Sequence, residues 1–114
     1  MDATFIELSS FQKYRAEYLN DDQFRLFQNM LLDDPEKGDL IPDTGGLRKV
    51  RFRDARRHKG TRGGLRVIYY WTNEKSLFIL FTLYGKDQCD DLTKPQRDAL
   101  ADALNVIKKG LRHE

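Results

Sequence analysis

Residues 77–84 form the longest apolar run in the chain, and they constrain the fold more than any other feature. Apolar side chains occupy both alternating sets of positions, so a strand at this place needs cover on both faces. We therefore predict a central strand over residues 76–85. A second strand over residues 66–72 is indicated by its β-branched and aromatic residues, and the sequence TNEK between the two predicts a turn.

Helix signals lie on both sides of these strands. Three pairs of residues have the spacing of a capping box, and each pair precedes apolar residues that recur every three or four positions. The pairs are Ser9 with Gln12, Asn20 with Gln23, and Thr93 with Gln96. The first two predict consecutive helices that end before Pro35, because proline disfavours further helix. The third predicts a C-terminal helix.

The remaining segments complete a single domain. Residues 4–8 predict a short edge strand, residues 36–46 a loop rich in Gly and Pro, residues 47–53 a strand, and residues 54–64 a basic loop. The predicted order of elements is β-α-α-β-β-β-α. Because 114 residues is the size of one hydrophobic core, we expect one domain spanning residues 1–114.

Positive charge is concentrated in one segment. Between Gly45 and Arg66 nine basic residues face one acid, Asp54, which gives nine minus one, or +8. The basic residues are Arg48, Lys49, Arg51, Arg53, Arg56, Arg57, Lys59, Arg62 and Arg66. The whole chain carries +2, so the rest of it sums to −6. Such asymmetry is typical of a protein that binds a polyanion.

Strand alternation places Lys49, Arg51 and Arg53 on one face of residues 47–53. A solvated sheet face is one explanation, because charges there prevent edge pairing. Arg66 opens the next strand, however, and Lys86 follows the one after it. If the three strands are neighbours, these cations converge, and converging guanidinium and ammonium groups suit a phosphate.

Aromatic residues adjoin this basic region. Tyr69, Tyr70, Trp71 and Tyr84 lie in the two strands that follow it. Single-stranded bases stack on aromatic rings while their phosphates pair with Lys and Arg, so Tyr84 above all is a candidate for RNA binding. Core packing is the alternative for some of these rings, because alternation turns part of them inward.

Other kinds of site find little support. Cys89 is the single cysteine, which excludes an internal disulfide, and His58 with His113 are the only histidines, so we expect no metal site and no cofactor. The acidic pairs at residues 33–34 and 90–91 adjoin predicted helix ends and are interpreted as caps. The chain begins without signal-peptide character, so we expect a cytoplasmic location.

Several segments of the sequence resemble a known family. The segment FQKYRAEYLNDDQFRLFQ is followed by TGGLRKVRF, a basic loop, RGGLRVIYYW and LFILFTLYGKDQCDDLT. The order of these segments is similar to that in HigB-type toxins of the RelE/ParE superfamily. The resemblance implies an α+β, RelE-like fold: two N-terminal helices and a C-terminal helix on one side of a twisted, largely antiparallel sheet, with an RNA site on the open face. It also implies a ribosome-dependent endoribonuclease that cuts messenger RNA in the A site, and an antitoxin of the HigA type, a helix-turn-helix protein.

The resemblance also implies roles for particular residues. Its strand cations match Lys49 and Arg51, with Arg53 two positions further, and its later basic positions match Arg66 and Lys86. Arg56, Arg57, Lys59 and Arg62 in the basic loop are then expected to anchor RNA or ribosome phosphates. The sequence departs from the family where a tyrosine is expected, within residues 89–93, and where Asp87 replaces a second cation.

The chemistry consistent with these residues is a metal-free attack of a ribose 2′-OH on the adjacent phosphate. Lys49 is the predicted general base, with Lys86 as the rival, because like-charged neighbours push the pKa of a lysine downward. Arg51 and Arg66 are expected to stabilise the charge of the transition state. Two alternatives remain open: a ParE-like toxin that inhibits gyrase, and an RNA-binding module without catalysis.

Overall fold

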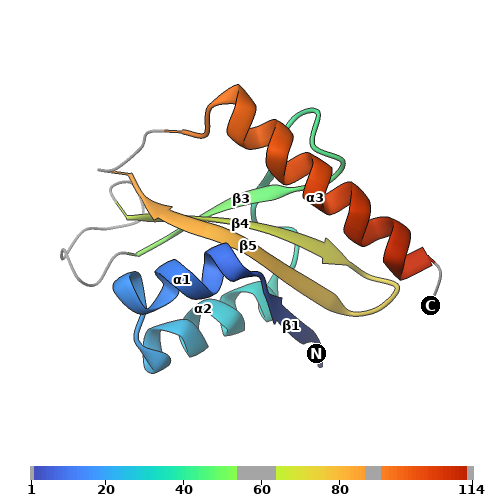
Figure 1. Cartoon of the computed structure of the whole chain (residues 1–114). Coiled ribbons are helices and arrows are strands. Elements are labelled where there is room, and N and C mark those ends of the chain that lie inside the picture. The colour runs from blue at the N-terminus through green and yellow to red at the C-terminus, as the bar shows by residue number, and fades with distance from the viewer. Residues whose placement is uncertain (1, 54–63, 87–90, 113–114) are drawn as a thin grey trace.

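The computed structural model describes residues 2–53, 64–86 and 91–112, and these contain three helices and five strands (Figure 1). In chain order the elements are β1 (Thr4–Glu7), α1 (Ser9–Tyr18), α2 (Asp21–Asp33), β2 (Asp39–Leu40), β3 (Arg48–Phe52), β4 (Leu65–Thr72), β5 (Leu77–Gly85) and α3 (Lys94–Arg112). The predicted order is confirmed with one addition. The two-residue strand β2 lies within the segment that was predicted to be a loop.

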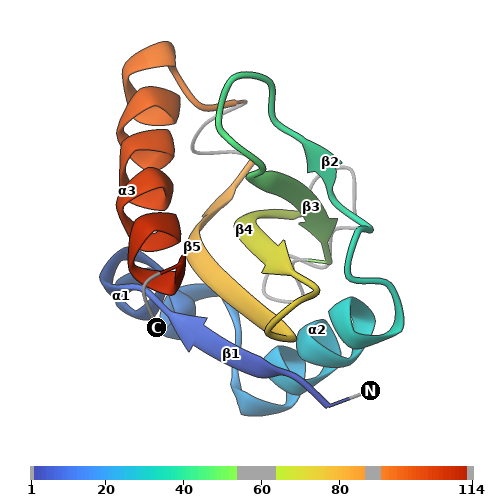
Figure 2. The same ribbon diagram turned by 90° about the vertical axis from the view of Figure 1, so that its right-hand side faces the viewer.

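The strands form one sheet in the order β1-β5-β4-β3-β2, which can be followed in Figure 2. β1 runs parallel to β5, and the other neighbours are antiparallel. β5 therefore has a neighbour on each side, as its apolar run predicted. The α+β fold with a largely antiparallel sheet is confirmed.

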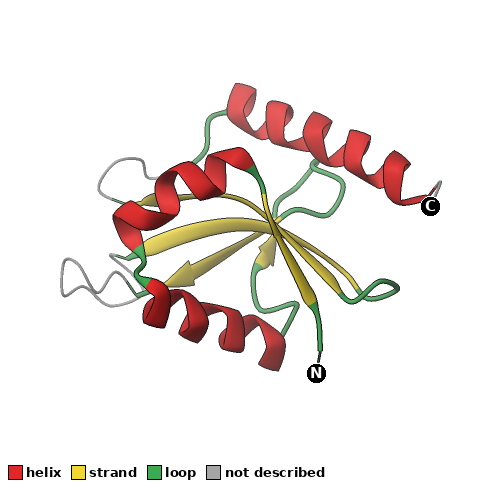
Figure 3. Ribbon diagram, turned by 60° about the horizontal axis from the view of Figure 1, so that its bottom comes forward, coloured by secondary structure: helices red, strands yellow, loops and turns green. Residues whose placement is uncertain are grey.

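Helices cover both faces of the sheet (Figures 1 and 3). Phe11 of α1 and Phe27 of α2 share one core with Val67 of β4. Leu104 of α3 shares the other core with Ile68, the next residue of β4. The prediction that all helices lie on one side was wrong for α3, because β4 and β5 carry apolar residues on both faces and each face needs cover.

Two of the three predicted capping boxes are present. In each box the side chain of the first residue accepts from the backbone N–H of the last, whose own side chain accepts in return. The pairs are Asn20 with Gln23, at 2.8 and 2.9 Å, and Thr93 with Gln96, at 3.3 and 2.9 Å. The predicted box at Ser9 and Gln12 was wrong, because α1 already begins at Ser9 and its N-cap is Leu8, which has no side-chain acceptor.

A buried tyrosine fixes the segment that leads to the sheet's far edge. The Tyr69 hydroxyl donates to the Pro35 carbonyl at 2.8 Å and accepts from the Gly38 N–H at 3.0 Å. A Cβ at Gly38 would lie 2.8 Å from Cε1 of the Tyr69 ring, so only glycine fits there. Arg48 Nη1 donates to the Gly38 carbonyl at 2.7 Å. These bonds hold β2 against β3.

Burial raises the pKa of Tyr69 above its usual value, although the Gly38 hydrogen bond and the Arg48 charge act in the opposite direction.

Candidate functional site

The strand register places two arginines directly opposite each other. Arg51 of β3 pairs with Arg66 of β4, and Arg66 pairs in turn with Tyr84 of β5. Side chains at paired positions lie on the same face, about 5 Å apart at Cβ, and like charges at such positions destabilise a sheet. Arg51 forms no ion pair within the described residues. We call Arg51 and Arg66 the arginine pair.

Arg66 is only 4% exposed, so it does not lie on an open sheet face as predicted. Its Nη1 lies 3.3 Å from the Leu65 carbonyl oxygen and 3.5 Å from that of Gly64. Burial lowers the pKa of Arg66, with the neighbouring Arg51 charge as the second cause. A guanidinium nevertheless stays protonated in proteins. The arginine pair thus places two positive charges side by side on one face of the sheet.

Lys49 lies beside the arginine pair in an ion pair. Its Nζ is 3.2 Å from Oδ1 of Asp91, which also accepts the backbone N–H of Leu92 at 2.8 Å. Burial alone would raise the pKa of Asp91, but the Leu92 N–H and the Lys49 ammonium outweigh it and lower this pKa below its usual value. Asp91 was predicted to cap a helix; instead Thr93 caps α3, and Asp91 contacts Lys49.

A cavity of about 510 Å³ opens beside these residues, and we call it the proximal cavity. Its walls are residues 39–43, which include β2, two residues of β3, and residues before and within the first turns of α3. Lys49, Arg51, Lys94 and Arg97 face Asp39, Asp43, Asp91 and Asp98. The charges of the lining therefore balance, and a phosphate entering the cavity has to compete with carboxylates for the cations.

Of the other predicted cations, Lys86 and Arg53 belong to the described residues, whereas those of the basic loop do not. Lys86 is exposed, and its backbone N–H donates to the Gly64 carbonyl at 3.2 Å, which places it beside the start of β4. Arg53 is exposed just beyond the end of β3. The basic loop residues lie outside the described residues, as do some others that the sequence singled out: Arg56, Arg57, His58, Lys59, Arg62, Asp87, Cys89, Asp90 and His113.

Of the four aromatic residues, only Tyr84 lies beside the arginine pair, opposite Arg66. Tyr84 is buried in the core beneath α3, so its position does not support the predicted stacking on a base. Tyr69 is fully buried, and the Trp71 ring packs on Phe78 with centroids 4.4 Å apart. Tyr70 lines a different cavity, near the end of α3. Core packing, the alternative reading, therefore holds for three of the four rings.

Asp91 and Arg97 are site residues that the sequence reasoning missed. Asp91 lies 42 positions from Lys49 in the chain, and Arg97 Nη1 donates to the Leu92 carbonyl at 2.9 Å. Their placement depends on where the start of α3 packs, which no local pattern indicates. The sequence did contain one useful signal. Thr93 alone can cap the C-terminal helix, so Asp91 was not needed as a cap and was available for another contact.

Two other kinds of feature are absent from the described residues. No group of three or more His, Cys, Asp or Glu side chains is placed to hold a metal ion in this part of the chain. None of the described helices is long and apolar enough to cross a membrane. No family model matches the sequence.

Solved structures share the fold. A mutant of the Escherichia coli toxin RelE in the free state superposes with a TM-score of 0.55 at 14% identity, over 79% of this chain and 90% of RelE. The intact E. coli RelBE toxin–antitoxin complex contains a chain that matches with a TM-score of 0.50 at 14% identity, over 72% of this chain and 94% of that one. The chain therefore has the fold of the toxin RelE.

Proposed function

We propose that this protein is the toxin of a toxin–antitoxin system and an endoribonuclease that cuts messenger RNA on the ribosome. The observation that carries the proposal is the arginine pair, Arg51 opposite Arg66, beside Lys49 in a sheet with the RelE fold. Like charges at paired positions repel each other, and a phosphate bound at the exposed Arg51 offsets part of that repulsion.

The proposed reaction is a transesterification within RNA. A base removes the 2′-OH proton, the O2′–P bond forms, the P–O5′ bond breaks, and the leaving 5′ oxygen takes up a proton. Cyclic phosphate and 5′-OH ends result. Arg51, which is exposed and lines the proximal cavity, contacts the phosphate and stabilises the added negative charge, and the buried Arg66 contributes through its charge. Lys49 is the proposed base and Lys86 the rival. The Lys49 ammonium must first give up a proton, and the Asp91 carboxylate 3.2 Å away, whose pKa is lowered, can accept that proton or take one from the 2′-OH directly.

The balanced charge of the proximal cavity supports dependence on the ribosome. Asp91 holds the Lys49 ammonium, so a phosphate must displace this carboxylate before it reaches the lysine. Such a site binds free RNA weakly. A ribosome that presents the messenger strand in a fixed geometry supplies the positioning that this cavity lacks.

The proposal includes an antitoxin partner. The RelBE complex shares the fold, and in that complex a toxin chain is held by its antitoxin. We propose a HigA-type helix-turn-helix protein in this role, on the sequence resemblance. Co-expression of this chain with the reading frame beside its gene tests the pairing: rescue of growth and co-purification of the two proteins support it.

Messenger RNA cleavage is tested with the purified protein, translating ribosomes and a defined message. Mapping of the new 5′ ends should show discrete cuts that need the ribosome. The upstream fragments should carry cyclic phosphates. Intact message together with blocked gyrase activity supports the ParE-like alternative. RNA binding without cuts supports the binding-module alternative. Either result refutes the proposed activity.

A further inference from the structure

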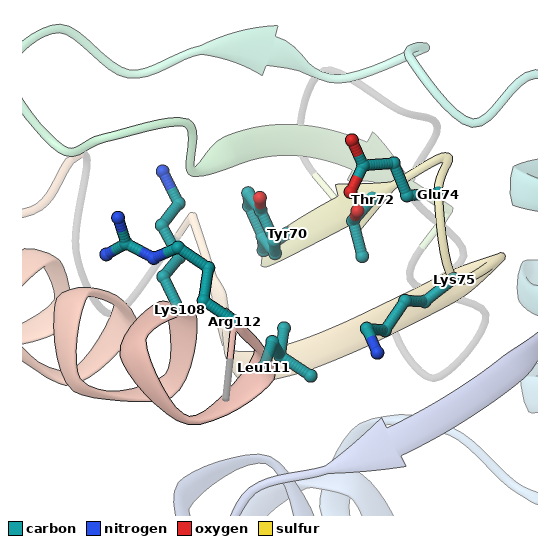
Figure 4. Close-up of a pocket in the computed structure, with 7 residues that line it drawn as sticks. All are labelled: Tyr70, Thr72, Glu74, Lys75, Lys108, Leu111 and Arg112. Atoms are coloured by element: carbon teal, nitrogen blue, oxygen red, sulfur yellow. The ribbon is translucent and has the colours of Figure 1, made fainter. Parts of the chain in front are cut away.

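A large cavity lies near each end of α3, and the two differ in how their cations are arranged. The cavity near the end of α3 has a volume of about 530 Å³. In Figure 4, Lys75 lies across this cavity from Lys108 and Arg112, so these cations do not converge on one anion. The proximal cavity, at the start of α3, differs because arginines from two separate elements line it.

The four cations of the proximal cavity are not equally available to a ligand. Lys49 and Lys94 each contact a carboxylate oxygen, at 3.2 and 2.8 Å. Arg51 and Arg97 form no ion pair with any of the described residues. Arg51 comes from β3 and Arg97 from α3. Two guanidinium groups on different walls are therefore the cations that an incoming anion can reach without displacing a carboxylate.

The Arg97 side chain is held in place by the start of α3. Its Nη1 donates to the Leu92 carbonyl at 2.9 Å, and its backbone N–H donates to the Thr93 carbonyl at 2.9 Å. The capping box of Thr93 and Gln96 fixes where the helix begins. A guanidinium has five N–H donors, and the Leu92 carbonyl engages one of them. Arg97 thus lines the cavity with a positioned side chain that has donors to spare.

A purely structural role does not explain the charge of Arg97. The first positions of a helix carry partial positive charge, which acidic side chains offset and basic ones increase. The first turn of α3 contains no acidic residue, whereas Lys94 and Arg97 both lie within its first four positions. A clamp on the Leu92 carbonyl needs one donor and no positive charge. The charge itself is accounted for if an anion binds beside it.

Asp91 relates Arg97 to the cations of β3. Its Oδ1 lies 3.2 Å from Lys49 Nζ and accepts the Leu92 N–H at 2.8 Å. The pKa of Asp91, which burial alone would raise, is lowered by the Leu92 N–H, by the Lys49 ammonium and then by the Arg97 charge. Lys49 and Arg51 are two residues apart on β3, or roughly 7 Å at 3.3 Å per residue. The cavity of about 510 Å³ has room for more than one phosphate group.

We propose that Arg97 binds a second phosphate of the RNA strand, next to the phosphate at Arg51. This inference rests on the proposed function, because it places a neighbouring part of the same substrate in the same cavity. A guanidinium forms paired hydrogen bonds with phosphate oxygens, and such contacts position a strand without reading its bases. The substrate is then a single strand with at least two consecutive phosphates, of any base sequence at these positions.

An NMR titration of the full chain with 2′-O-methyl oligonucleotides tests this inference. These ligands lack the attacking hydroxyl, so binding is measured without cleavage. A dinucleotide with one phosphodiester is compared, at low salt, with a trinucleotide that has two. The wild type should bind the trinucleotide about ten-fold more tightly, because the second phosphate adds a charged hydrogen bond.

Substitutions of Arg97 separate this contact from general attraction. Arg97→Gln should bind the trinucleotide about ten-fold more weakly than the wild type, and the dinucleotide within about two-fold of it. The unchanged dinucleotide affinity also shows that the variant keeps a folded cavity. Arg97→Lys keeps the charge and should lie between the other two proteins. Lys94→Gln is the matched control: it removes the same charge from the same turn, where Asp98 already holds the ammonium, and should weaken trinucleotide binding less than about three-fold.

Three results would overturn the inference. Equal affinity of the wild type for the two oligonucleotides would mean that no second phosphate is bound. Equal losses for Arg97→Gln and Lys94→Gln would indicate attraction by net charge. A loss for Arg97→Gln that is as large with the dinucleotide would place Arg97 at the first phosphate.

The outcome is separate from that of the cleavage test. A message that stays intact on ribosomes, together with a ten-fold difference that Arg97→Gln abolishes, would refute the proposed activity and support the second phosphate contact. Cleavage of the message without that difference would refute the contact of Arg97 alone.

Discussion

Replacement of Tyr69 by Phe removes one oxygen from a site where two backbone groups depend on it. The Pro35 carbonyl loses its donor at 2.8 Å and the Gly38 N–H loses its acceptor at 3.0 Å, while the ring itself is fully buried and stays in place. Each buried polar group left without a partner costs about 1 to 2 kcal/mol, so the free energy of unfolding should fall by about 2 to 4 kcal/mol. For 114 residues this lowers the melting temperature by about 8 to 16 °C.

Urea and thermal denaturation followed by circular dichroism measure this loss. Tyr70→Phe is the matched control, because it removes a hydroxyl from the next residue, which is only half-buried, and it should cost less than about 1 kcal/mol. An equal loss in the two variants, or a loss below 1 kcal/mol for Tyr69→Phe, would refute the structural role of the buried hydroxyl.

The pKa of Tyr69 adds a test at alkaline pH. Because its folded-state pKa is raised above the usual value of 10.0, the neutral phenol is favoured in the folded protein. The resulting stability is fully present below pH 10.0 and is lost as the pH rises through the folded-state pKa. The wild type should therefore lose stability more steeply than Tyr69→Phe above pH 10.0. Parallel pH profiles would contradict the shift.

Two further substitutions probe the neighbourhood of the proximal cavity. Asp91→Asn removes the carboxylate that holds Lys49 and should tighten the binding of single-stranded RNA about three-fold or more in a low-salt fluorescence titration. Asp98→Asn removes the same charge from the same cavity and should have a smaller effect. Equal gains in the two variants would show that net charge alone sets the affinity. Gly38→Ala brings a Cβ against the Tyr69 ring and should lower the free energy of unfolding by about 1 to 3 kcal/mol in urea denaturation, and unchanged stability would disprove the close contact.

The sequence predicted the elements that depend on local patterns. The apolar run at residues 77–84 requires cover on both faces, and β5 indeed lies inside the sheet with helices on both sides. The boxes at Asn20 and Thr93 depend on contacts three residues apart, so they can be recognised without knowledge of the tertiary structure. Strand alternation likewise placed Lys49 and Arg51 on one face.

The features that were missed depend on distant packing. Alternation allows Arg66 and Arg51 to share a face if their strands are neighbours, as they are. It does not indicate that this face is covered well enough to bury the Arg66 side chain. The same holds for Tyr84, whose ring lies in the core formed with α3. The contact between Lys49 and Asp91 joins residues 42 positions apart. Each depends on where α3 crosses the sheet, which no local signal determines.

The rate of messenger RNA cleavage by Arg51→Gln, with translating ribosomes, tests the proposed function most directly. Arg51 is exposed and makes no ion pair with described residues, so the variant should fold and melt like the wild type. Arg25→Gln, an exposed arginine on α2, is the control. Loss of one preorganised donor to the transition state should slow cleavage about 100-fold or more, with the control unchanged. Cleavage within about two-fold of the wild-type rate by folded Arg51→Gln protein would contradict a catalytic arginine pair.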